Sequence, residues 1–218
     1  MNALLYALFG IALLAPTPPA SPPRSAAEVV RGIQTFYQTT TDLKADFTQT
    51  YAYKVYDRKQ VSKGKVYFKK PGRMRWDYQS PQARLFVADG ATLWVYEPEE
   101  AQVFKRALAQ SQLPVALTFM SGSGRLEDEF DAKLLPAPGA DRLAVELIPR
   151  KSAADYQSLR LEVDARTFAV VRSTVVDPVG NLNTIDFTQV QTNSNLPEKG
   201  FQFTPPPGVR VIDDLGGR

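Results

Sequence analysis

The chain has no cysteine and no histidine among its 218 residues. Without cysteine it can form no disulfide, and it offers no thiolate nucleophile, thiolate metal ligand or thiol for a covalent lipid anchor. Without histidine it has no histidine general base, no Ser-His-Asp triad and no imidazole metal ligand. These two absences remove the commonest catalytic and metal-binding arrangements, so we expect a protein without enzymatic activity.

Other signals of catalysis or cofactor binding are weak as well. Acidic residues at positions 127, 128, 129 and 131 lack the ligand spacing and the glycine of a calcium loop, so we expect a solvated helix face there. The segment Ser121-Gly122-Ser123-Gly124 lacks the spacing of a nucleophile elbow and is typical of a flexible link. No glycine-rich phosphate loop joins a predicted strand to a helix. We therefore expect neither a metal nor a cofactor.

The charge pattern gives no reason to expect nucleic-acid binding. Lys and Arg number 26 against 23 Asp and Glu, for a net charge of +3. The cations are spread along the chain without a dense block, whereas nucleic-acid-binding domains gather them on one face.

Long hydrophobic runs are missing except near the N-terminus. Residues 4–14 are almost all apolar, and residues 16–23 are rich in proline and alanine. The run is too short for a comfortable membrane span and is typical of a secretory signal peptide. We expect residues 1–20 to be a signal peptide and residues 21–218 to be one domain. Because residues 1–3 contain no Lys or Arg, an uncleaved anchor or a misassigned start remains the alternative.

Periodicity predicts one helix followed by many strands. Ser25 and Glu28 form a capping-box pattern, and apolar residues then recur at helical spacing over residues 26–39. From Leu43 onward the period changes to two, with turn residues between segments. The predicted strands are 43–55, 61–70, 73–79, 84–88, 92–97, 101–106, 142–149, 158–164, 168–176 and 182–190.

These elements predict a mainly β fold with a small helical cover. Leu113, Leu117 and Met120 lie at helical spacing, and residues 126–130 could add a further short turn. A sheet of about ten strands twists and curls, and its apolar face must be covered. Three short helices give a cover that opens easily, so the interior is a candidate site for an apolar ligand. An ordinary filled core explains the same pattern.

The Lys-Pro-Gly turn at residues 70–72 is the most informative stretch. Pro71 and Gly72 suit a tight turn, and Met74, Trp76 and Tyr78 then share one face of the next strand. Lys70 continues the inward row of the preceding strand after Val66 and Phe68, which is an unusual place for a cation. A slip of one residue after the turn would invert these faces.

Several segments together resemble the outer-membrane lipoprotein carrier protein (LolA) family. The similarity covers nearly all of the chain after the signal region, and its motifs keep their order and spacing. The segments are Asp46-Phe47-Thr48-Gln49-Thr50, Gly64-x-Val66-Tyr67-Phe68-x-Lys70-Pro71-Gly72-Arg73-x-Arg75-Trp76, Val87-x-Asp89-Gly90-x-Thr92-Leu93-Trp94-Val95-Tyr96 and Phe203-Thr204-Pro205-Pro206-x-Gly208-Val209.

The resemblance implies an incomplete antiparallel β-barrel of about eleven strands, closed by a helical lid over an apolar cavity. It implies a monomeric periplasmic carrier that takes lipoproteins by their acyl chains from an inner-membrane ABC-type exporter to an outer-membrane acceptor. In that family an arginine at the position of Lys70 bonds lid carbonyls and holds the empty form shut. Lysine lacks the planar fork of arginine, so the resemblance implies a weaker latch here.

We expect two groups of residues to form the site. The cavity wall comprises Phe47, Tyr51, Val66, Phe68, Met74, Trp76, Leu85, Val87, Leu93 and Val95. The lid comprises Ile33, Phe36, Leu113, Leu117, Phe119 and Met120. Each residue could equally be ordinary core. A carrier of glycolipids or other lipids, or a lipid-sensing regulatory module, remains an alternative function.

Overall fold

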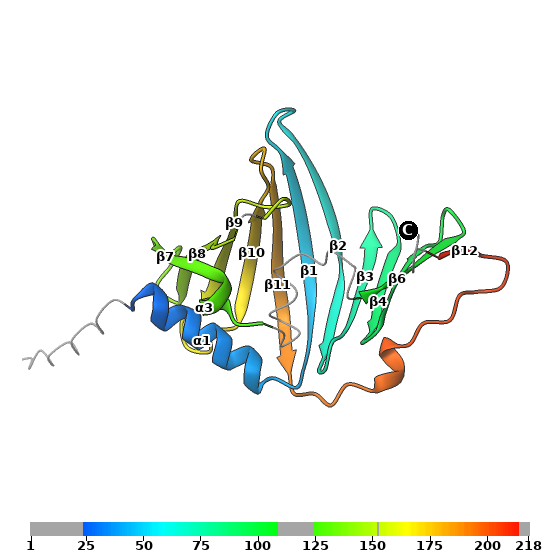
Figure 1. The fold of residues 1–218 in the computed structure, drawn as a ribbon, viewed down its shortest axis with the longest axis horizontal. Helices are drawn as coiled ribbons and strands as arrows, with labels where there is room; N and C mark the ends of the chain where they lie inside the picture. The colour runs from blue at the N-terminus through cyan, green and yellow to red at the C-terminus, as the bar shows by residue number, and fades with distance from the viewer. Residues whose placement is uncertain (1–23, 109–123, 152, 214–218) are drawn as a thin grey trace, which may run out of the picture.

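The computed structural model describes residues 24–108, 124–151 and 153–213. These residues form one 12-stranded sheet in the order β12-β6-β5-β4-β3-β2-β1-β11-β10-β9-β8-β7 (Figure 1). The strands are β1 Asp42–Tyr53, β2 Arg58–Lys69, β3 Arg73–Ser80, β4 Arg84–Asp89, β5 Thr92–Glu97, β6 Gln102–Ala107, β7 Phe130–Leu135, β8 Arg142–Pro149, β9 Ser158–Asp164, β10 Val170–Val176, β11 Leu182–Thr192 and β12 Arg210–Asp213. The sheet curls but does not close, so the predicted incomplete barrel is confirmed.

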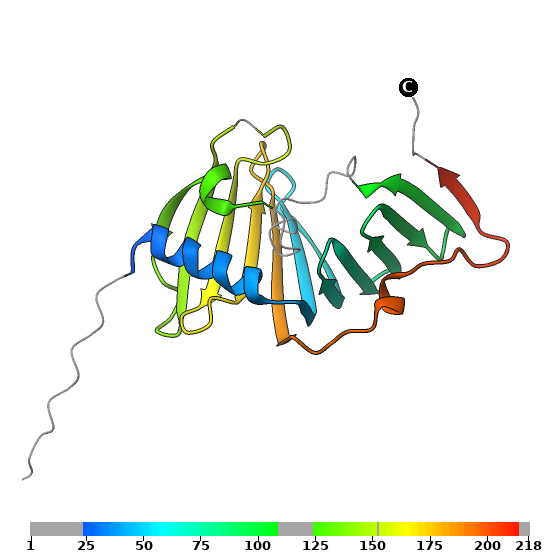
Figure 2. The same cartoon turned by 60° about the horizontal axis from the view of Figure 1, so that its bottom comes forward.

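The helix α1, Ala26–Thr39, has the bounds that the sequence predicts. Ser25 Oγ accepts a hydrogen bond from the Glu28 amide at 3.2 Å, and the Glu28 carboxylate accepts one from the Ser25 amide at 2.6 Å. This capping box satisfies two of the donors that a helix start leaves free. Figure 2 shows α1 lying across the half of the sheet formed by β7 to β11. We call the face that α1 covers the inner face.

The predicted strands agree with the observed ones to within three residues, and two further strands were not predicted. One is β7, which follows the short helix α3, Leu126–Glu129. The other is β12, which pairs with β6 in parallel orientation, whereas the sequence pattern predicted antiparallel pairing throughout. The helix expected around Leu113 and Leu117 lies outside the described residues.

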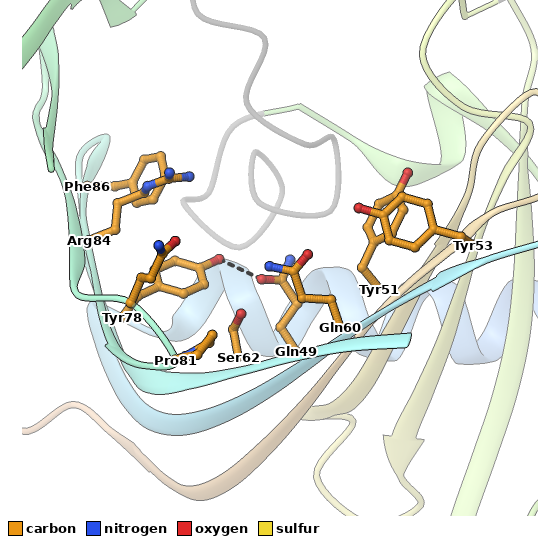
Figure 3. A pocket seen from close by; sticks show the side chains of 10 residues that line it. Gln49, Tyr51, Tyr53, Gln60, Ser62, Tyr78, Pro81, Arg84 and Phe86 are labelled. Carbon is orange, nitrogen blue, oxygen red and sulfur yellow. Dashed lines mark hydrogen bonds between the residues drawn. The ribbon is translucent and has the colours of Figure 1, made fainter. Parts of the chain in front are cut away.

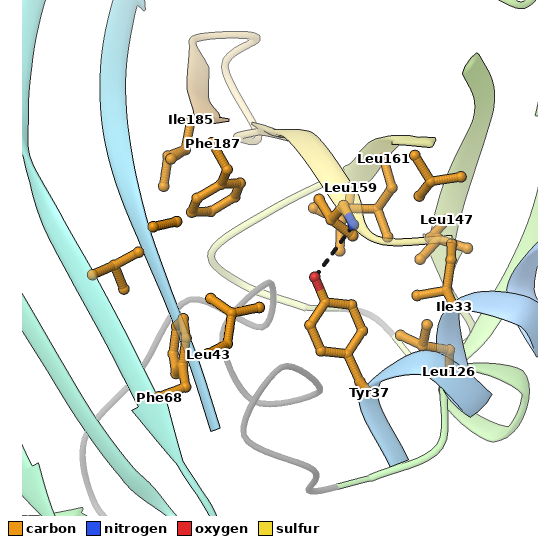
Figure 4. Close-up of a cluster of buried hydrophobic side chains, with 14 of the residues drawn as sticks. Ile33, Tyr37, Leu43, Phe68, Leu126, Leu147, Leu159, Leu161, Ile185 and Phe187 are labelled. Atoms are coloured by element: carbon orange, nitrogen blue, oxygen red, sulfur yellow. Dashed lines mark hydrogen bonds between the residues drawn. The ribbon is translucent and has the colours of Figure 1, made fainter. Parts of the chain in front are cut away.

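The main core lies between α1 and the inner face (Figure 4). Ile33 and Tyr37 on α1 are buried, and they pack in the same cluster as Leu159 and Leu161 on β9. The Tyr37 hydroxyl accepts a hydrogen bond from the Val170 amide at 3.3 Å, which satisfies its polar end. Burial of such side chains stabilises the fold by about 1.5–3 kcal/mol each.

A second, smaller layer covers part of the opposite face, which we call the outer face. The chain after β11 passes through the 3-10 helix η2, Glu198–Phe201, and returns toward β12. Phe201 is buried, and the Phe203 ring lies 5.8 Å from Trp94 and 5.7 Å from Tyr96. Strands in this half of the sheet therefore carry apolar residues on both faces.

Candidate functional site

Aromatic rings form a continuous row along the inner face. Phe47 on β1 lies 4.8 Å from Trp76 and 4.8 Å from Tyr78, both on β3. The Phe68 ring on β2 and the Phe187 ring on β11 also lie close to Trp76, at 6.0 and 6.3 Å. Such edge and offset contacts stabilise beyond simple burial, and the rings present a wide apolar surface.

Strand register decides which predicted wall residues share this face. Residues directly opposite one another on paired strands point to the same side of a sheet. Trp76 pairs with Phe86, and Met74 pairs with Ala88. The placement of Leu85 and Val87 in the wall is therefore wrong, because they pair with Asp77 and Arg75 and point to the outer face. Phe86 and Ala88 take the inner positions instead.

The other predicted wall residues lie on the inner face. Phe86 pairs with Val95 and Ala88 with Leu93, so the row continues onto β5. Those that are buried are Phe47, Val66, Phe68, Met74, Trp76 and Leu93, whereas Tyr51 and Val95 are half-buried. Their proximity makes them candidates for contact with a ligand, and it is equally the packing of a core.

One buried donor in this row lacks a partner. The indole nitrogen Nε1 of Trp76 forms no hydrogen bond, although the side chain is 3% exposed. Among the described residues, it is the sole buried side-chain nitrogen or oxygen without a hydrogen-bond partner. An unpaired buried donor costs about 1–3 kcal/mol, so its presence needs an explanation.

A cleft of about 300 Å³ opens where the aromatic row ends. Its lining comprises Gln49, Tyr51, Tyr53, Gln60, Ser62, Tyr78, Pro81, Gln82, Arg84 and Phe86. Figure 3 shows the sheet curving around it, with the hydroxyl of Tyr78 directed at Gln49. The cleft is more polar than the row beneath it, so the inner face grades from an apolar floor to a polar rim.

The rim is held by a short hydrogen-bond chain. The Tyr78 hydroxyl donates to Gln49 Oε1 at 2.9 Å, and Gln49 Nε2 donates to Asn183 Oδ1 at 2.8 Å. Burial raises the pKa of Tyr78 to about 12, so its hydroxyl remains a neutral donor at ordinary pH. Alternation along β1 already put Gln49 and Tyr53 on the predicted inner face, but no sequence signal identified Gln60, Ser62 or Arg84.

Lys70 joins the sheet to the end of α1. Its Nζ donates to the carbonyl oxygens of Tyr37 at 2.5 Å and Gln38 at 2.8 Å. The last turn of α1 has no basic residue of its own, so Lys70 supplies the cation that helix C-termini favour. Burial lowers the pKa of Lys70.

Two of the predicted lid residues can be placed. Ile33 is fully buried on the side of α1 that faces the sheet, and Phe36 is half-buried, with its ring 4.9 Å from that of Tyr37. The other four, Leu113, Leu117, Phe119 and Met120, lie outside the described residues.

Across residues 24–108, 124–151 and 153–213, no group of three or more acidic side chains is arranged to hold a metal ion. Within the same ranges, no helix is long and apolar enough to cross a membrane.

In the described part of the chain, an open, curled sheet with an aromatic inner face and a long helix across it forms a half-barrel. Comparison with known proteins identifies which half-barrel this is. The model of the family described as outer membrane lipoprotein carrier protein LolA matches residues 38–204. The chain therefore belongs to the LolA family, which is a family of carriers rather than enzymes.

Individual relatives agree with this assignment. The chain is 31% identical over 186 residues to an outer-membrane lipoprotein carrier protein of Methylibium petroleiphilum, covering 85% of this chain and 90% of the relative. The protein of the same description from Nitrosomonas europaea is 28% identical over 214 residues, covering 98% and 100%. A solved structure of an uncharacterized conserved protein from Thermus thermophilus has a TM-score of 0.56 at 15% identity, covering 86% and 98%, and supports the fold alone.

Proposed function

We propose that this protein is a periplasmic carrier that buries the acyl chains of lipoproteins against the inner face of its sheet. It receives them from an inner-membrane ABC-type exporter and delivers them to an outer-membrane acceptor. Membership of the LolA family supports the carrier role. The observation that supports the location of the site is the aromatic row from Phe68 to Phe86, which runs into the cleft.

The energetics of acyl chains explain why such a carrier is needed. A cargo with three chains of about 16 carbons has roughly 45 methylenes, and exposing them at ~0.8 kcal/mol each would cost on the order of 35 kcal/mol. Free diffusion through water is therefore negligible. A carrier must bury most of this surface, and the apolar inner face is a surface against which the acyl chains can be buried.

Release requires that binding be much weaker than this sum. A ligand held at the limit of non-covalent affinity would not leave. In the proposed cycle the cargo displaces α1 from the inner face, so the packing of Ile33, Phe36 and Tyr37 competes with cargo. Lys70 acts as the latch that favours the closed form, because its two hydrogen bonds to α1 must break when the helix moves.

The unpaired indole of Trp76 supports a specific contact within this site. The acyl chains of a lipoprotein are attached through ester and amide carbonyls, which accept hydrogen bonds. A carbonyl entering beside Trp76 would satisfy Nε1 and remove the cost that the empty form bears. The empty carrier would thus hold a donor that pairs only when cargo is bound.

Native mass spectrometry of the mature protein tests the carrier function. The protein is incubated with a donor membrane that contains a triacylated lipoprotein and its exporter. We expect a one-to-one complex in the soluble fraction. Co-purified glycolipid or phospholipid without such a complex would favour a general lipid carrier, and no bound lipid of any kind would contradict the carrier function.

Trp76→Phe tests the proposed contact with a cargo carbonyl. We expect the free energy of unfolding to change by less than about 1.5 kcal/mol. The smaller phenyl ring loses some packing, but the substitution also removes an unpaired buried donor. Affinity for an ester-linked lipopeptide should fall about fivefold to tenfold, the equivalent of one hydrogen bond. Fluorescence titration with a labelled lipopeptide measures this.

The same substitution on the outer face is the control. Trp94→Phe changes a ring that packs on Phe203, so cargo affinity should stay the same. An ether-linked analogue, which lacks the carbonyls, should bind the parent protein and Trp76→Phe equally. An equal loss for both lipids would show that Trp76 acts through packing alone.

A further inference from the structure

The hairpin between β1 and β2 projects beyond the rest of the sheet (Figure 1). Each of its strands has 12 residues, whereas β3 to β6 have 6 to 8. Residues 54–57 form its turn, and we call residues 54–59 the hairpin tip. A projecting tip is the part of the molecule that first meets any flat surface brought to it from that side.

The hairpin tip exposes large apolar side chains. Val55 is 76% exposed and Tyr56 is 78% exposed, the highest values for large hydrophobic residues in the described part of the chain. Val179, at the neighbouring turn between β10 and β11, is 63% exposed. The two turns are tied together, because the Lys54 amide donates to Asn181 Oδ1 at 3.0 Å. Single exposed apolar residues are common, but a group at one projecting end indicates a contact surface.

The hairpin tip also carries unpaired cations. Lys54, Arg58 and Lys59 are exposed and outnumber the one carboxylate, Asp57. None of these four forms an ion pair with another described residue. Some cations on the outer face are instead held in ion pairs, as Lys65 is with Asp46 at 2.6 Å and Arg172 with Asp186 at 2.6 Å. Charge at the hairpin tip is therefore available to an anionic partner.

The hairpin tip leads directly into the candidate site. Tyr53 and Gln60 line the cleft (Figure 3). Tyr53 pairs with Arg58 across the hairpin. The inner face of the hairpin thus runs without a break from the hairpin tip to the cleft and on to the aromatic row. A surface that contacts the hairpin tip is placed next to the mouth of the cavity.

We propose that the hairpin tip docks the carrier on an anionic phospholipid surface, an inference that rests on the proposed carrier function. Val55 and Tyr56 enter the interfacial zone of the bilayer, and the three cations contact phosphate headgroups. Docking places the cleft at the membrane, so acyl chains pass along the hairpin between bilayer and cavity with little exposure to water. The hairpin tip is a turn of a few residues, which is small for a stable protein interface of about 800 Å² a side.

Vesicle co-sedimentation of the mature protein tests this docking. The vesicles contain phosphatidylcholine with about one-third phosphatidylglycerol, or phosphatidylcholine alone. We expect binding to the anionic vesicles that weakens as salt is raised, and little binding to the neutral ones. Lys54→Gln/Arg58→Gln/Lys59→Gln should reduce partitioning on the order of a hundredfold, from about fivefold per cation. Val55→Ser/Tyr56→Ser should reduce it about tenfold.

Matched variants away from the hairpin tip control for net charge and hydrophobicity. Lys133→Gln/Lys151→Gln/Lys199→Gln removes three exposed cations elsewhere, and Val211→Ser removes a 46% exposed apolar residue on β12. Both should bind the anionic vesicles like the parent protein. A fluorescent long-chain fatty acid, titrated without vesicles, reports on the cavity and should bind every variant equally.

Each other outcome has a distinct meaning. Vesicle binding that is equal for both lipid compositions, or unchanged in the tip variants, overturns the docking inference. Fatty-acid binding without vesicle binding overturns docking and leaves the carrier function standing. Binding only to vesicles that contain the exporter, or a dimer that the tip variants abolish, assigns the hairpin tip to a protein partner or a second copy and overturns the membrane docking. Vesicle binding without fatty-acid binding overturns the carrier function instead.

Discussion

Gly64→Ala should lower the free energy of unfolding by more than about 3 kcal/mol or prevent folding altogether. A Cβ at Gly64 would lie 2.0 Å from the Asp77 carbonyl oxygen and 2.9 Å from the Phe47 ring. The first contact is with backbone, so no side-chain rotation relieves it. Circular dichroism during urea unfolding measures the loss.

Gly64 is sensitive because it lies where the sheet bends. The register between β2 and β3 shifts at residues 63 and 64, and Gly64 faces inward beneath two rings, Phe47 and Tyr78, which lie 4.8 Å apart. A β-bulge bends the strand, and the missing side chain lets the rings meet above the backbone. The same position therefore sets both the curl of the sheet and the floor of the candidate site.

Gly200→Ala is the matched control for Gly64→Ala. A Cβ at Gly200 would meet nothing within 4 Å, so the free energy of unfolding should change by less than about 0.5 kcal/mol. Equal stability of the two variants would mean that the bulge can slide along β2 and that close packing at residue 64 is not required for the fold.

Local rules predicted most of the fold because the local signals agree with the final packing. The capping box at Ser25 gave both ends of α1 once the apolar spacing was followed, and clean alternation gave both ends of β8 and β9. The strand β12 could not be found in this way. It has four residues and pairs with β6 from a distant part of the chain, so its presence depends on tertiary contact.

The faces of β4 show where alternation fails. Residues 85–88 are apolar without a break because Phe86 and Ala88 face the inner core, while Val87 is buried on the outer face, where it pairs with Trp94. A strand that is covered on both sides has no periodic signal. Only the pairing of Tyr78 with Arg84 fixes the faces, and this depends on the length and conformation of the intervening loop.

The candidate site was predictable in its apolar part and only partly in its polar rim. Phe47, Phe68 and Trp76 follow from alternation and from the family motifs. Gln60, Ser62 and Arg84 are polar residues in stretches that look solvated, and they meet at the cleft only because the sheet curls. Their chemistry comes from three-dimensional convergence, which a linear pattern does not encode.

Lys70→Met should strengthen cargo binding and weaken the closed form of the carrier. Methionine keeps the length of the side chain but removes the charged donor to the Tyr37 and Gln38 carbonyls. The free energy of unfolding should fall by about 1–3 kcal/mol, because the end of α1 loses its cation. If about 2 kcal/mol of this favours the closed form, cargo affinity rises on the order of tenfold or more, and release to an acceptor slows accordingly.

Lys69→Met separates this effect from a general loss of stability. Lys69 is the sequence neighbour of Lys70 and donates to the Leu196 carbonyl at 2.5 Å, within the segment that follows β11. Its loss should also reduce the free energy of unfolding, but it breaks no contact with α1, so cargo affinity should not change. Lys70→Arg should hold the closed form at least as firmly as the parent lysine does, since a guanidinium can donate to both carbonyls from a fixed fork.

Transfer kinetics from a lipopeptide-bearing donor decide between a latch and a structural cation. A latch predicts that Lys70→Met raises affinity while its stability falls, and that the dye bis-ANS, which fluoresces on exposed apolar surface, brightens in the empty protein. A purely structural cation predicts that Lys70→Met and Lys69→Met behave alike. The sign of the change in affinity is decisive, because loss of packing weakens binding, whereas release of a closed state strengthens it.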